Sequence, residues 1–461
     1  MDELNPQKLK AAVKYINSWL EVNFENSRLP AMQVAIQHGS KIIYSEAFGY
    51  SDVKAKEKLN TRNVFRIASH SKTFTATAIM LLVEAGKLNL DDKVNKYVSW
   101  FKSSKDKRVQ EVTIRQLLNH TAGIVRDGYD SNFWQLLHEF PDKNELKAFI
   151  SDSKLVYDPD EKFKYSNFGF GYLGQVIEAV SEVSYREYVT KNIVDKLGLK
   201  STGPDLDSKA KKLLATGYGI EIFNKERRVF DHIDTHALSS ATGFYSNAED
   251  CCRYFASHFI GNNSLISDKS KRLMQHGYWK SEGTKERYGL GMVNYKLNSW
   301  NIFGHSGGFP GFTTNTKFDA KKQLVVSVLI NAYGTYTSNI CSKLISIIDT
   351  FQQDTANIKT DVTNLKKFEG RFFCTWGPTD VILAGKKLLA IDPLNWADFE
   401  DCEELTVLDE DTLKIAKSSG YGHSGELIKY KFDSKGKITS FTYAGRTMLP
   451  FNEAQKQGWF S

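Results

Sequence analysis

The sequence has few cysteines, and none of them lies in a recognisable metal or redox motif. Five cysteines among 461 residues cannot all pair with one another. None forms a Cys-x-x-Cys motif or has a histidine at metal-ligand spacing, so neither a zinc site nor a dithiol redox site is indicated. We therefore expect no bound metal and no cofactor. The free thiols are typical of a reducing compartment.

The sequence also lacks long hydrophobic runs. No apolar stretch approaches the roughly 20 residues that a membrane-spanning helix needs. The first ten residues lack the apolar core of a signal peptide. We expect no membrane partner and a cytoplasmic location, unless a leader has been removed.

A block of one charge sign is missing as well. The 61 basic and 54 acidic residues leave a net charge of +7, which is mild for this length. No basic block is interleaved with aromatic residues, so nucleic-acid binding is not expected. Apolar residues at 41% and charged residues at 25% describe a globular protein with an ample core. The length predicts two or three domains.

The first three quarters of the chain combine strand-like and helix-like patterns. A helical pattern over residues 6–24 precedes a predicted hairpin over residues 32–48. Residues 88–237 are mostly helical and rich in loops, and strand patterns return at residues 301–304, 313–318 and 324–330. This order predicts one domain over residues 1–351, a layer of strands and helices that contains a helical insertion. The cleft between the two parts is a natural active site.

The remainder of the chain has a different period. Residues 352–364 are polar and are predicted to be a linker. Short strand-like runs with turn residues between them follow, and they predict a small antiparallel barrel over residues 365–461. The runs are residues 368–374, 379–384, 387–391, 404–408, 412–416, 427–432, 437–443 and 447–451.

A serine and a lysine three residues apart form the most informative local pattern. Ser69 and Lys72 stand at the start of a predicted amphipathic helix that Gly86 ends. Both side chains lie on one helix face, and a lysine held neutral can remove the proton of the serine hydroxyl. The spacing recurs elsewhere in the chain, and Ser69 could simply cap the helix with Lys72 on its surface.

Two further clusters follow in the sequence. One contains Tyr165 two residues before Asn167, just ahead of an apolar helix pattern. The other is a glycine-rich run over residues 304–311, with His305 near its start, between two strand-like segments. Each cluster alone is more often structural. Their order, Ser-x-x-Lys, then Tyr-x-Asn, then His-x-Gly, is the more specific signal.

With these three motifs the chain resembles the serine β-lactamase-like hydrolases, a group of class C β-lactamases, DD-peptidases, D-aminopeptidases and esterases. The resemblance covers roughly residues 10–350, and the segments at residues 65–69, 113–123 and 241–250 also look like the family. It implies an α+β fold, with an antiparallel sheet flanked by helices. The last part of the chain resembles, more loosely, the lipocalin-like barrel that follows such domains.

The resemblance implies a role for each catalytic candidate. Ser69 would be the acylated nucleophile, Lys72 its base, and Tyr165 would share protons with Lys72 and the leaving group. His305 stands where many relatives have lysine and would orient the substrate or help to activate water, and strong β-lactamase activity is not expected. His120 would be structural.

The resemblance also implies which residues bind the substrate. Asn167 would hydrogen-bond the substrate or hold Lys72, and Ser306, Gly307 and Gly308 would bind the substrate along a strand. The backbone N–H groups of Ser69 and Gly308 would form the oxyanion hole.

Together these features predict a serine hydrolase that cleaves amide bonds in small peptides or D-amino-acid derivatives through an acyl-enzyme. Three alternatives stay open: an esterase for small acyl esters, a penicillin-binding or sensor-like protein that is only acylated, and a purely structural protein. The expected partner is a small molecule or a short peptide. Self-association through the C-terminal barrel is also expected.

Overall fold

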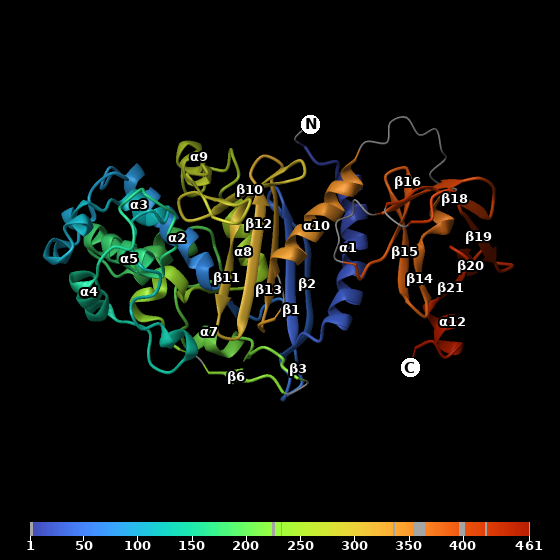
Figure 1. Cartoon of the computed structure of the whole chain (residues 1–461), viewed down its shortest axis with the longest axis horizontal. Helices are drawn as coiled ribbons and strands as arrows, with labels where there is room; N and C mark the ends of the chain where they lie inside the picture. The colour runs from blue at the N-terminus through green and yellow to red at the C-terminus, as the bar shows by residue number, and fades with distance from the viewer. Residues whose placement is uncertain are drawn as a thin grey trace. The chain divides into compact units, whose positions relative to one another are not determined.

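The computed structural model describes residues 3–223, 226–231, 233–334, 337–353, 365–395, 402–419 and 422–460 (Figure 1). They form two compact units, one of residues 29–341 and one that joins residues 3–28 to residues 342–460. The domain boundaries predicted from the sequence stay predictions. Most of the predicted linker, residues 354–364, lies outside the described residues.

The unit of residues 29–341 contains a nine-stranded sheet within its described part. The strand order is β3-β2-β1-β13-β12-β11-β10-β9-β8, and neighbouring strands are antiparallel. This confirms the α+β prediction of an antiparallel sheet flanked by helices. The strands of the sheet are β1 (Ala31–His38), β2 (Lys41–Asp52), β3 (Glu57–Lys58), β8 (Trp279–Lys280), β9 (Arg287–Tyr288), β10 (Val293–Leu297), β11 (Trp300–Phe309), β12 (Phe312–Asp319) and β13 (Leu324–Ile330).

The central strands carry the core of this sheet. β13 reads Leu-Val-Val-Ser-Val-Leu-Ile and is buried along its whole length, as is nearly all of β1 beside it. β-branched residues suit such a strand because their side chains pack well on a pleated surface. Helix α8 (Ala248–Ala256) packs on β1 and β13, and the Cys252 thiol donates to the Ala35 carbonyl over 3.4 Å.

The helices between residues 71 and 181 gather beside the β11 side of the sheet, away from β2 and β3 (Figure 1). Helix α2 packs against α5 and against η8 (Ser239–Gly243), a π-helical turn. The other helices are α2 (Ser71–Glu84), α3 (Ile114–Leu118), α4 (Lys143–Asp152), α5 (Asn167–Ser181), α6 (Tyr185–Val189), α7 (Ser208–Leu213) and α9 (Asp268–Gln275). Two short strand pairs complete the unit, β4 (Phe65–Arg66) with β7 (Tyr245–Ser246) and β5 (Gly217–Tyr218) with β6 (Val229–Phe230).

Strand β11 is longer than the sequence predicts. The predicted strand covers residues 301–304, whereas β11 continues through the glycine-rich run to Phe309 and pairs with β12 throughout its second half. Glycine lowers strand propensity, but cross-strand pairing with β12 overrides that local preference. The chain turns only at Pro310 and Gly311.

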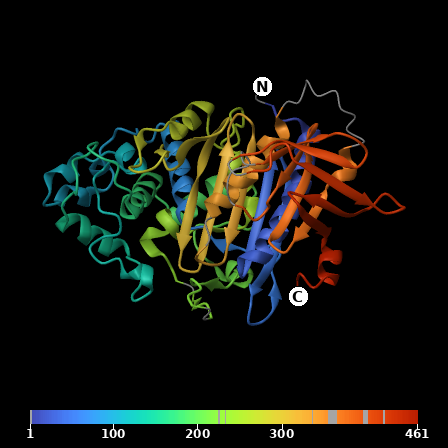
Figure 2. The ribbon, with the colours of Figure 1, turned by 45° about the vertical axis from the view of Figure 1, so that its right-hand side comes forward.

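The other unit contains the predicted barrel. Eight strands form a closed antiparallel barrel in which β21 pairs back onto β14, seen in orange and red in Figure 2. Its interior is filled with apolar side chains such as Phe368, Leu413 and Phe441. The strands are β14 (Gly370–Cys374), β15 (Gly377–Ala384), β16 (Lys387–Ile391), β17 (Glu403–Val407), β18 (Thr412–Lys417), β19 (Leu427–Phe432), β20 (Ile438–Tyr443) and β21 (Arg446–Pro450).

The barrel-containing unit also has helices, and α1 contacts the barrel directly. The Tyr15 hydroxyl, on α1 (Pro6–Ser27), donates to the Asp380 carboxylate over 2.9 Å. Asp380 also pairs with Arg371, whose guanidinium reaches the Ser18 carbonyl over 2.9 Å. These polar contacts tie α1 to the barrel. Helix α12 (Phe451–Lys456) also belongs to this unit, and α10 (Thr337–Gln352) begins in the unit of residues 29–341 and ends in this one. Among the described helices, none combines the length and the apolar character that a membrane crossing requires.

Candidate active site

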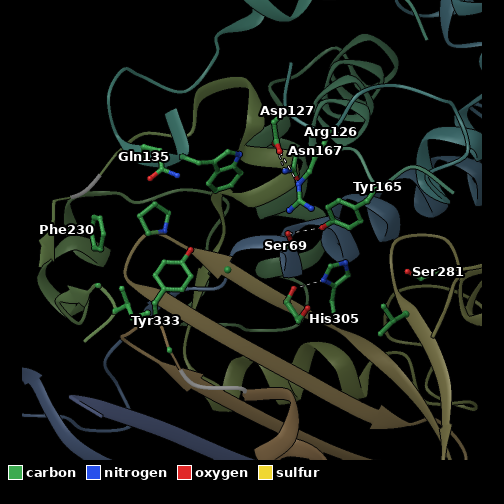
Figure 3. Close-up of a pocket in the computed structure, with 18 of the residues that line it drawn as sticks. Ser69, Arg126, Asp127, Gln135, Tyr165, Asn167, Phe230, Ser281, His305 and Tyr333 are labelled. Carbon is green, nitrogen blue, oxygen red and sulfur yellow. Dashed lines mark hydrogen bonds and ion pairs between the residues drawn. The ribbon is translucent and has the colours of Figure 1, made fainter. Parts of the chain in front are cut away.

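A large pocket opens in the unit of residues 29–341, with a volume of about 1270 Å³ (Figure 3). It brings together residues from all three sequence motifs. Ser69, Tyr165, Asn167, His305, Ser306 and Gly308 line it. The candidate residues are therefore neighbours in space, although they come from distant parts of the chain.

Ser69 lies in η1 (Ala68–His70), a single 3-10 turn that leads directly into α2. The sequence predicts Ser69 at the helix start, and the structure places it two residues before α2, in the 3-10 turn that leads into the helix. Ala68 has a φ of 49°, in the left-handed region that costs a residue with a side chain about 1–2 kcal/mol. The Ser71 hydroxyl donates to the Ala68 carbonyl over 2.6 Å and holds this turn.

Lys72 is fully buried behind Ser69. Its Nζ lies 3.1 Å from Ser69 Oγ, 2.7 Å from Asn167 Oδ1 and 2.9 Å from the Ala241 carbonyl oxygen. Burial lowers the pKa of Lys72 well below its usual value, and the nearby Asp127 carboxylate offsets part of that effect. Lys72 is therefore a candidate for a neutral amine near physiological pH.

Tyr165 contacts the nucleophile candidate from the other side. Its hydroxyl donates to Ser69 Oγ over 3.0 Å, and its ring lies 4.9 Å from Lys72 Nζ. Burial raises the pKa of Tyr165 to about 12, although the hydrogen bond to Ser69 lowers it slightly. The phenol is therefore protonated at neutral pH and acts as a hydrogen-bond donor.

Asn167 is the first residue of α5 and links Lys72 to a buried carboxylate. Its Nδ2 donates to Asp127 Oδ1 over 2.6 Å, while its Oδ1 faces Lys72. A carboxylate accepts hydrogen bonds only, so Asp127 fixes which way the amide points. Arg126 Nε donates to Asp127 over 3.0 Å, and its guanidinium lies 5.1 Å from the Tyr165 ring centre.

His305 is buried on β11 with both ring nitrogens engaged. Nδ1 lies 2.6 Å from the Ser306 carbonyl oxygen and Nε2 lies 2.9 Å from the Tyr288 hydroxyl. A carbonyl oxygen only accepts, so Nδ1 carries the proton and Nε2 accepts from Tyr288. Burial, with a smaller effect of Lys72, lowers the pKa of His305 to about 3. The imidazole is therefore neutral at physiological pH.

The three residues after His305 occupy different places. Ser306 and Gly308 are exposed in the pocket, whereas Gly307 is buried. A Cβ added at Gly307 would lie 2.3 Å from the Ile67 carbonyl oxygen, just before η1. Gly307 therefore allows β11 to pass closely beside η1 and does not itself line the pocket.

Two more histidines lie buried next to these residues. His120 Nδ1 accepts from the Ser166 N–H over 3.1 Å, and its ring packs 4.3 Å from the Tyr165 ring. His70 Nε2 lies 3.0 Å from Thr316 Oγ1. Burial lowers the pKa of His120 well below its usual value and that of His70 to about 4. His120 contacts aromatic rings and backbone, and its structural role stays a prediction.

A family model described as Beta-lactamase matches residues 14–340. The chain belongs to this Beta-lactamase family. The predicted resemblance to serine β-lactamase-like hydrolases is thereby confirmed.

Among curated proteins, two relatives illustrate the level of similarity. Protein flp from Staphylococcus aureus (strain MRSA252) is 26% identical over 340 residues, 71% of this chain and 65% of the relative. Penicillin-binding protein 4* from Bacillus subtilis (strain 168) is 28% identical over 315 residues, 65% of this chain and 68% of the relative. The match to Protein flp thus spans just under two thirds of that protein's own length.

Solved structures share the architecture. An octameric penicillin-binding protein homologue from Pyrococcus abyssi is 26% identical, with a TM-score of 0.66 over 95% of this chain and all of that one. A class C β-lactamase from Rhodobacter sphaeroides is 20% identical, with a TM-score of 0.62 over 72% of this chain and 99% of that one. The second likeness shows the fold alone. Family and fold are consistent with a serine hydrolase.

Several residues of the site are not predicted from the sequence. Asp127 and Arg126 follow the family-like segment of residues 113–123 but have no distinctive spacing to the other candidates. Tyr288 lies on a strand of two residues, which is too short to show a period. The Ala241 carbonyl is a backbone group of η8, so no residue type marks it. Only the folded chain identifies these contacts.

Asp127 provides the first testable prediction. Asp127→Ala should lower kcat/KM about tenfold, because Asn167 loses the acceptor that orients its amide towards Lys72. Asp127→Asn keeps an acceptor oxygen and should lower kcat/KM less. Both variants lose a negative charge that raises the pKa of Lys72, so the acid limb of the pH–rate profile should move to lower pH.

The control for Asp127 is Asp158→Asn, an exposed carboxylate that pairs with Arg108. It should change neither the rate nor the pH profile. Equal rates for the alanine and asparagine variants, or an acid limb that moves to higher pH, would contradict the positioning role.

The buried histidines predict acid sensitivity of the fold. Burial lowers the pKa of His70 to about 4 and that of His258 and His305 to about 3, and it lowers the pKa of His120 as well. Below pH 6.5 the unfolded chain binds protons at these sites and the folded chain does not. As the pH is lowered from about 6 to 4, the free energy of unfolding should therefore fall by about 1.4 kcal/mol per pH unit for each histidine. Urea unfolding at several pH values measures the slope, and a stability that stays constant over this range would refute it.

Proposed function

We propose that this protein is a serine hydrolase in which Ser69 forms an acyl-enzyme with amide substrates such as small peptides or D-amino-acid derivatives. One observation carries the proposal. Ser69 Oγ lies in the pocket within 3.1 Å of the Lys72 amine and 3.0 Å of the Tyr165 hydroxyl. A serine hydroxyl needs such a neighbouring base to become a nucleophile.

The contacts of Lys72 favour it as the base. A neutral amine has two N–H groups and one lone pair. The two shortest contacts, to Asn167 Oδ1 and the Ala241 carbonyl, use both N–H groups. The lone pair then faces Ser69 Oγ and accepts its proton. Tyr165 is protonated and donates to the same oxygen, so it is a poor base in the resting enzyme.

The proposed reaction follows from this arrangement. Ser69 Oγ attacks the carbonyl carbon while its proton passes to Lys72. The backbone N–H groups of Ser69 and Gly308 hold the oxyanion, a contribution of about 3–4 kcal/mol for each donor. The leaving nitrogen takes a proton from Lys72, through Tyr165, and the acyl group remains on Ser69. Water then attacks the ester carbonyl and gives a proton to Lys72, and Lys72 returns that proton to Ser69 Oγ as the acid product leaves.

His305 has a positioning role in this scheme. Both of its ring nitrogens are engaged and its neutral form is favoured, so it holds Tyr288 and β11 in place. An activity limb near pH 6.5, expected for an ordinary histidine, should therefore not arise from His305.

Hydrolysis of β-lactams is the corresponding prediction. A neutral His305 supplies no fixed cation for the carboxylate of a penicillin or cephalosporin. Nitrocefin turnover should be slower than that of the best ester or aminoacyl amide. A panel of D- and L-aminoacyl anilides, p-nitrophenyl esters and nitrocefin measures this order on the purified protein. Nitrocefin as the fastest substrate would contradict it.

The same panel separates the alternatives. Faster turnover of esters than of amides would favour the alternative that the protein is an esterase. Covalent labelling of Ser69 without turnover favours an acylation-only protein, an alternative supported by the name of the Bacillus relative, a penicillin-binding protein. No labelling at Ser69 by a fluorophosphonate would refute the proposed function.

Two expectations from the sequence stay proposals about the whole protein. We propose that the chain self-associates through its barrel, since the Pyrococcus abyssi homologue is octameric. Trp376, which is 84% exposed on the barrel, is a suitable residue to change. Light scattering of Trp376→Ser should show a smaller assembly than the unchanged protein. A cytoplasmic location likewise remains a prediction.

A further inference from the structure

An apolar surface lies in the same pocket as Ser69. We name it the apolar shelf, and it consists of Ile220, Ile222, Phe223 and Phe230. All four residues line the pocket together with Ser69. Figure 3 shows Phe230 and Tyr333 on the opposite side of the pocket from Tyr165 and His305. The shelf plays no part in the proton transfers of the proposed function.

The side chains of the shelf are unusually exposed. Ile220 is 55% exposed, Ile222 is 48% exposed and Phe223 is 91% exposed. Large apolar side chains that cluster on a surface typically mark a binding site, whereas single ones need no explanation. Here three of them lie within four residues and inside a pocket, so covering them with an apolar group is favourable.

The backbone that carries the shelf is fixed at its base. Strand β5 pairs with β6, and the Tyr218 N–H donates to the Asn331 carbonyl, beyond β13, over 2.9 Å. Arg227 Nη1 donates to the carbonyl oxygens of Gly219 over 2.8 Å and Tyr333 over 3.1 Å. These bonds tie the shelf to the sheet. The segment that carries the shelf is thus anchored at Tyr218, Gly219 and Arg227.

The pocket has room for a substrate that reaches the shelf. Its volume of about 1270 Å³ exceeds the roughly 300–1,000 Å³ of a typical small-molecule site. Charged residues line the pocket beside the shelf, and the Arg228 guanidinium lies 5.0 Å from the Phe230 ring centre. Mostly apolar walls with a few polar groups are the usual form of a small-molecule site.

We propose that the apolar shelf binds a hydrophobic group of the substrate, an alkyl chain of medium length or an aromatic ring. This inference rests on the proposed function, because the group belongs to the molecule whose carbonyl Ser69 attacks. The preferred substrates are then acylated or hydrophobic amino-acid derivatives. The group can sit on the acyl side or on the leaving-group side of the scissile bond, and the experiment separates the two.

The test compares two substrate series. One consists of p-nitrophenyl esters from acetate to octanoate, which lengthens the acyl side. The other consists of D-alanine alkyl esters from methyl to octyl, which lengthens the leaving group. In one series kcat/KM should rise with chain length, by up to about fourfold for each methylene that is fully buried. Chain-length preference is the ratio of kcat/KM for the longest substrate of a series to kcat/KM for the shortest. The double variant Ile222→Ser/Phe223→Ser should reduce this ratio at least about fivefold in the series that shows the preference.

Matched controls make the outcome decisive. Val156→Ser changes an apolar residue of similar exposure, 46%, that does not line the pocket, and it should keep the wild-type ratio. Fluorophosphonate labelling of Ser69 in every variant shows whether the nucleophile is intact. If the wild-type enzyme is labelled at Ser69 and turns over substrate without any chain-length preference, the role proposed for the shelf is wrong and the proposed function still holds.

Two other results would show that the shelf does not bind the substrate. An unchanged ratio in the double variant, together with a smaller assembly by light scattering, would mean that the shelf contacts a second copy of the chain. That result overturns the proposal. Absence of labelling and turnover in the wild-type protein would overturn both the shelf and the proposed function.

Discussion

Ser69→Ala should abolish turnover of every substrate that the protein hydrolyses. The account places the acyl group on Ser69 Oγ, which alone contacts both Lys72 Nζ and the Tyr165 hydroxyl among the described residues. Removal of a nucleophile of this kind lowers kcat by about 10⁴-fold or more. Steady-state kinetics with a p-nitrophenyl ester and an aminoacyl anilide measures the loss.

The chain supplies its own control for Ser69. Ser151 is also followed by a lysine three residues later, and its hydroxyl donates to the Lys147 carbonyl over 2.9 Å within α4. Ser151→Ala should therefore keep full activity. Residual turnover in Ser69→Ala within tenfold of the unchanged protein would show that another group is the nucleophile.

Lys72→Met should lower kcat/KM at least about 10²-fold, the low end for loss of a general base. Methionine keeps the apolar stem and removes the amine that lies 3.1 Å from Ser69 Oγ. The fold should survive, because the buried amine is costly to desolvate and its charged form is already disfavoured. Kinetics and thermal unfolding of the same preparation separate lost catalysis from lost structure.

The pH–rate profile gives Lys72 a second readout. The amine must be neutral to act as a base, and burial lowers its pKa. Activity should therefore persist at neutral pH and fall as acid protonates Lys72. Lys154→Ala, which removes the exposed lysine of another Ser-x-x-Lys pair, Ser151/Lys154, is the control and should leave the profile unchanged. A Lys72→Met variant with near wild-type rates would remove Lys72 from the mechanism.

Local patterns in the sequence predict part of this site. Ser69 and Lys72 are one helical turn apart, and Tyr165 and Asn167 share one short segment, so their spacing is visible without a structure. The barrel is visible for a similar reason, since alternation of apolar residues reports strands directly.

Other parts of the site depend on contacts that no local pattern encodes. Asp127 reaches Asn167 only because the loop before α5 and the turn after α3 meet in the fold. The Ala241 carbonyl approaches Lys72 from a π-helical turn far along the chain. Strand β11 runs through glycines that taken alone favour a loop, because β12 pairs with it. Tertiary pairing thus overrides local propensity at the point where the site is built.

The most direct test of the account is to trap the acyl-enzyme and locate it. The protein is mixed with a p-nitrophenyl ester, quenched in acid within the first turnovers, digested, and analysed by mass spectrometry. The account predicts that the peptide containing Ser69 gains the mass of the acyl group, with fragmentation placing it on Ser69. Turnover with the acyl group on another residue would contradict it.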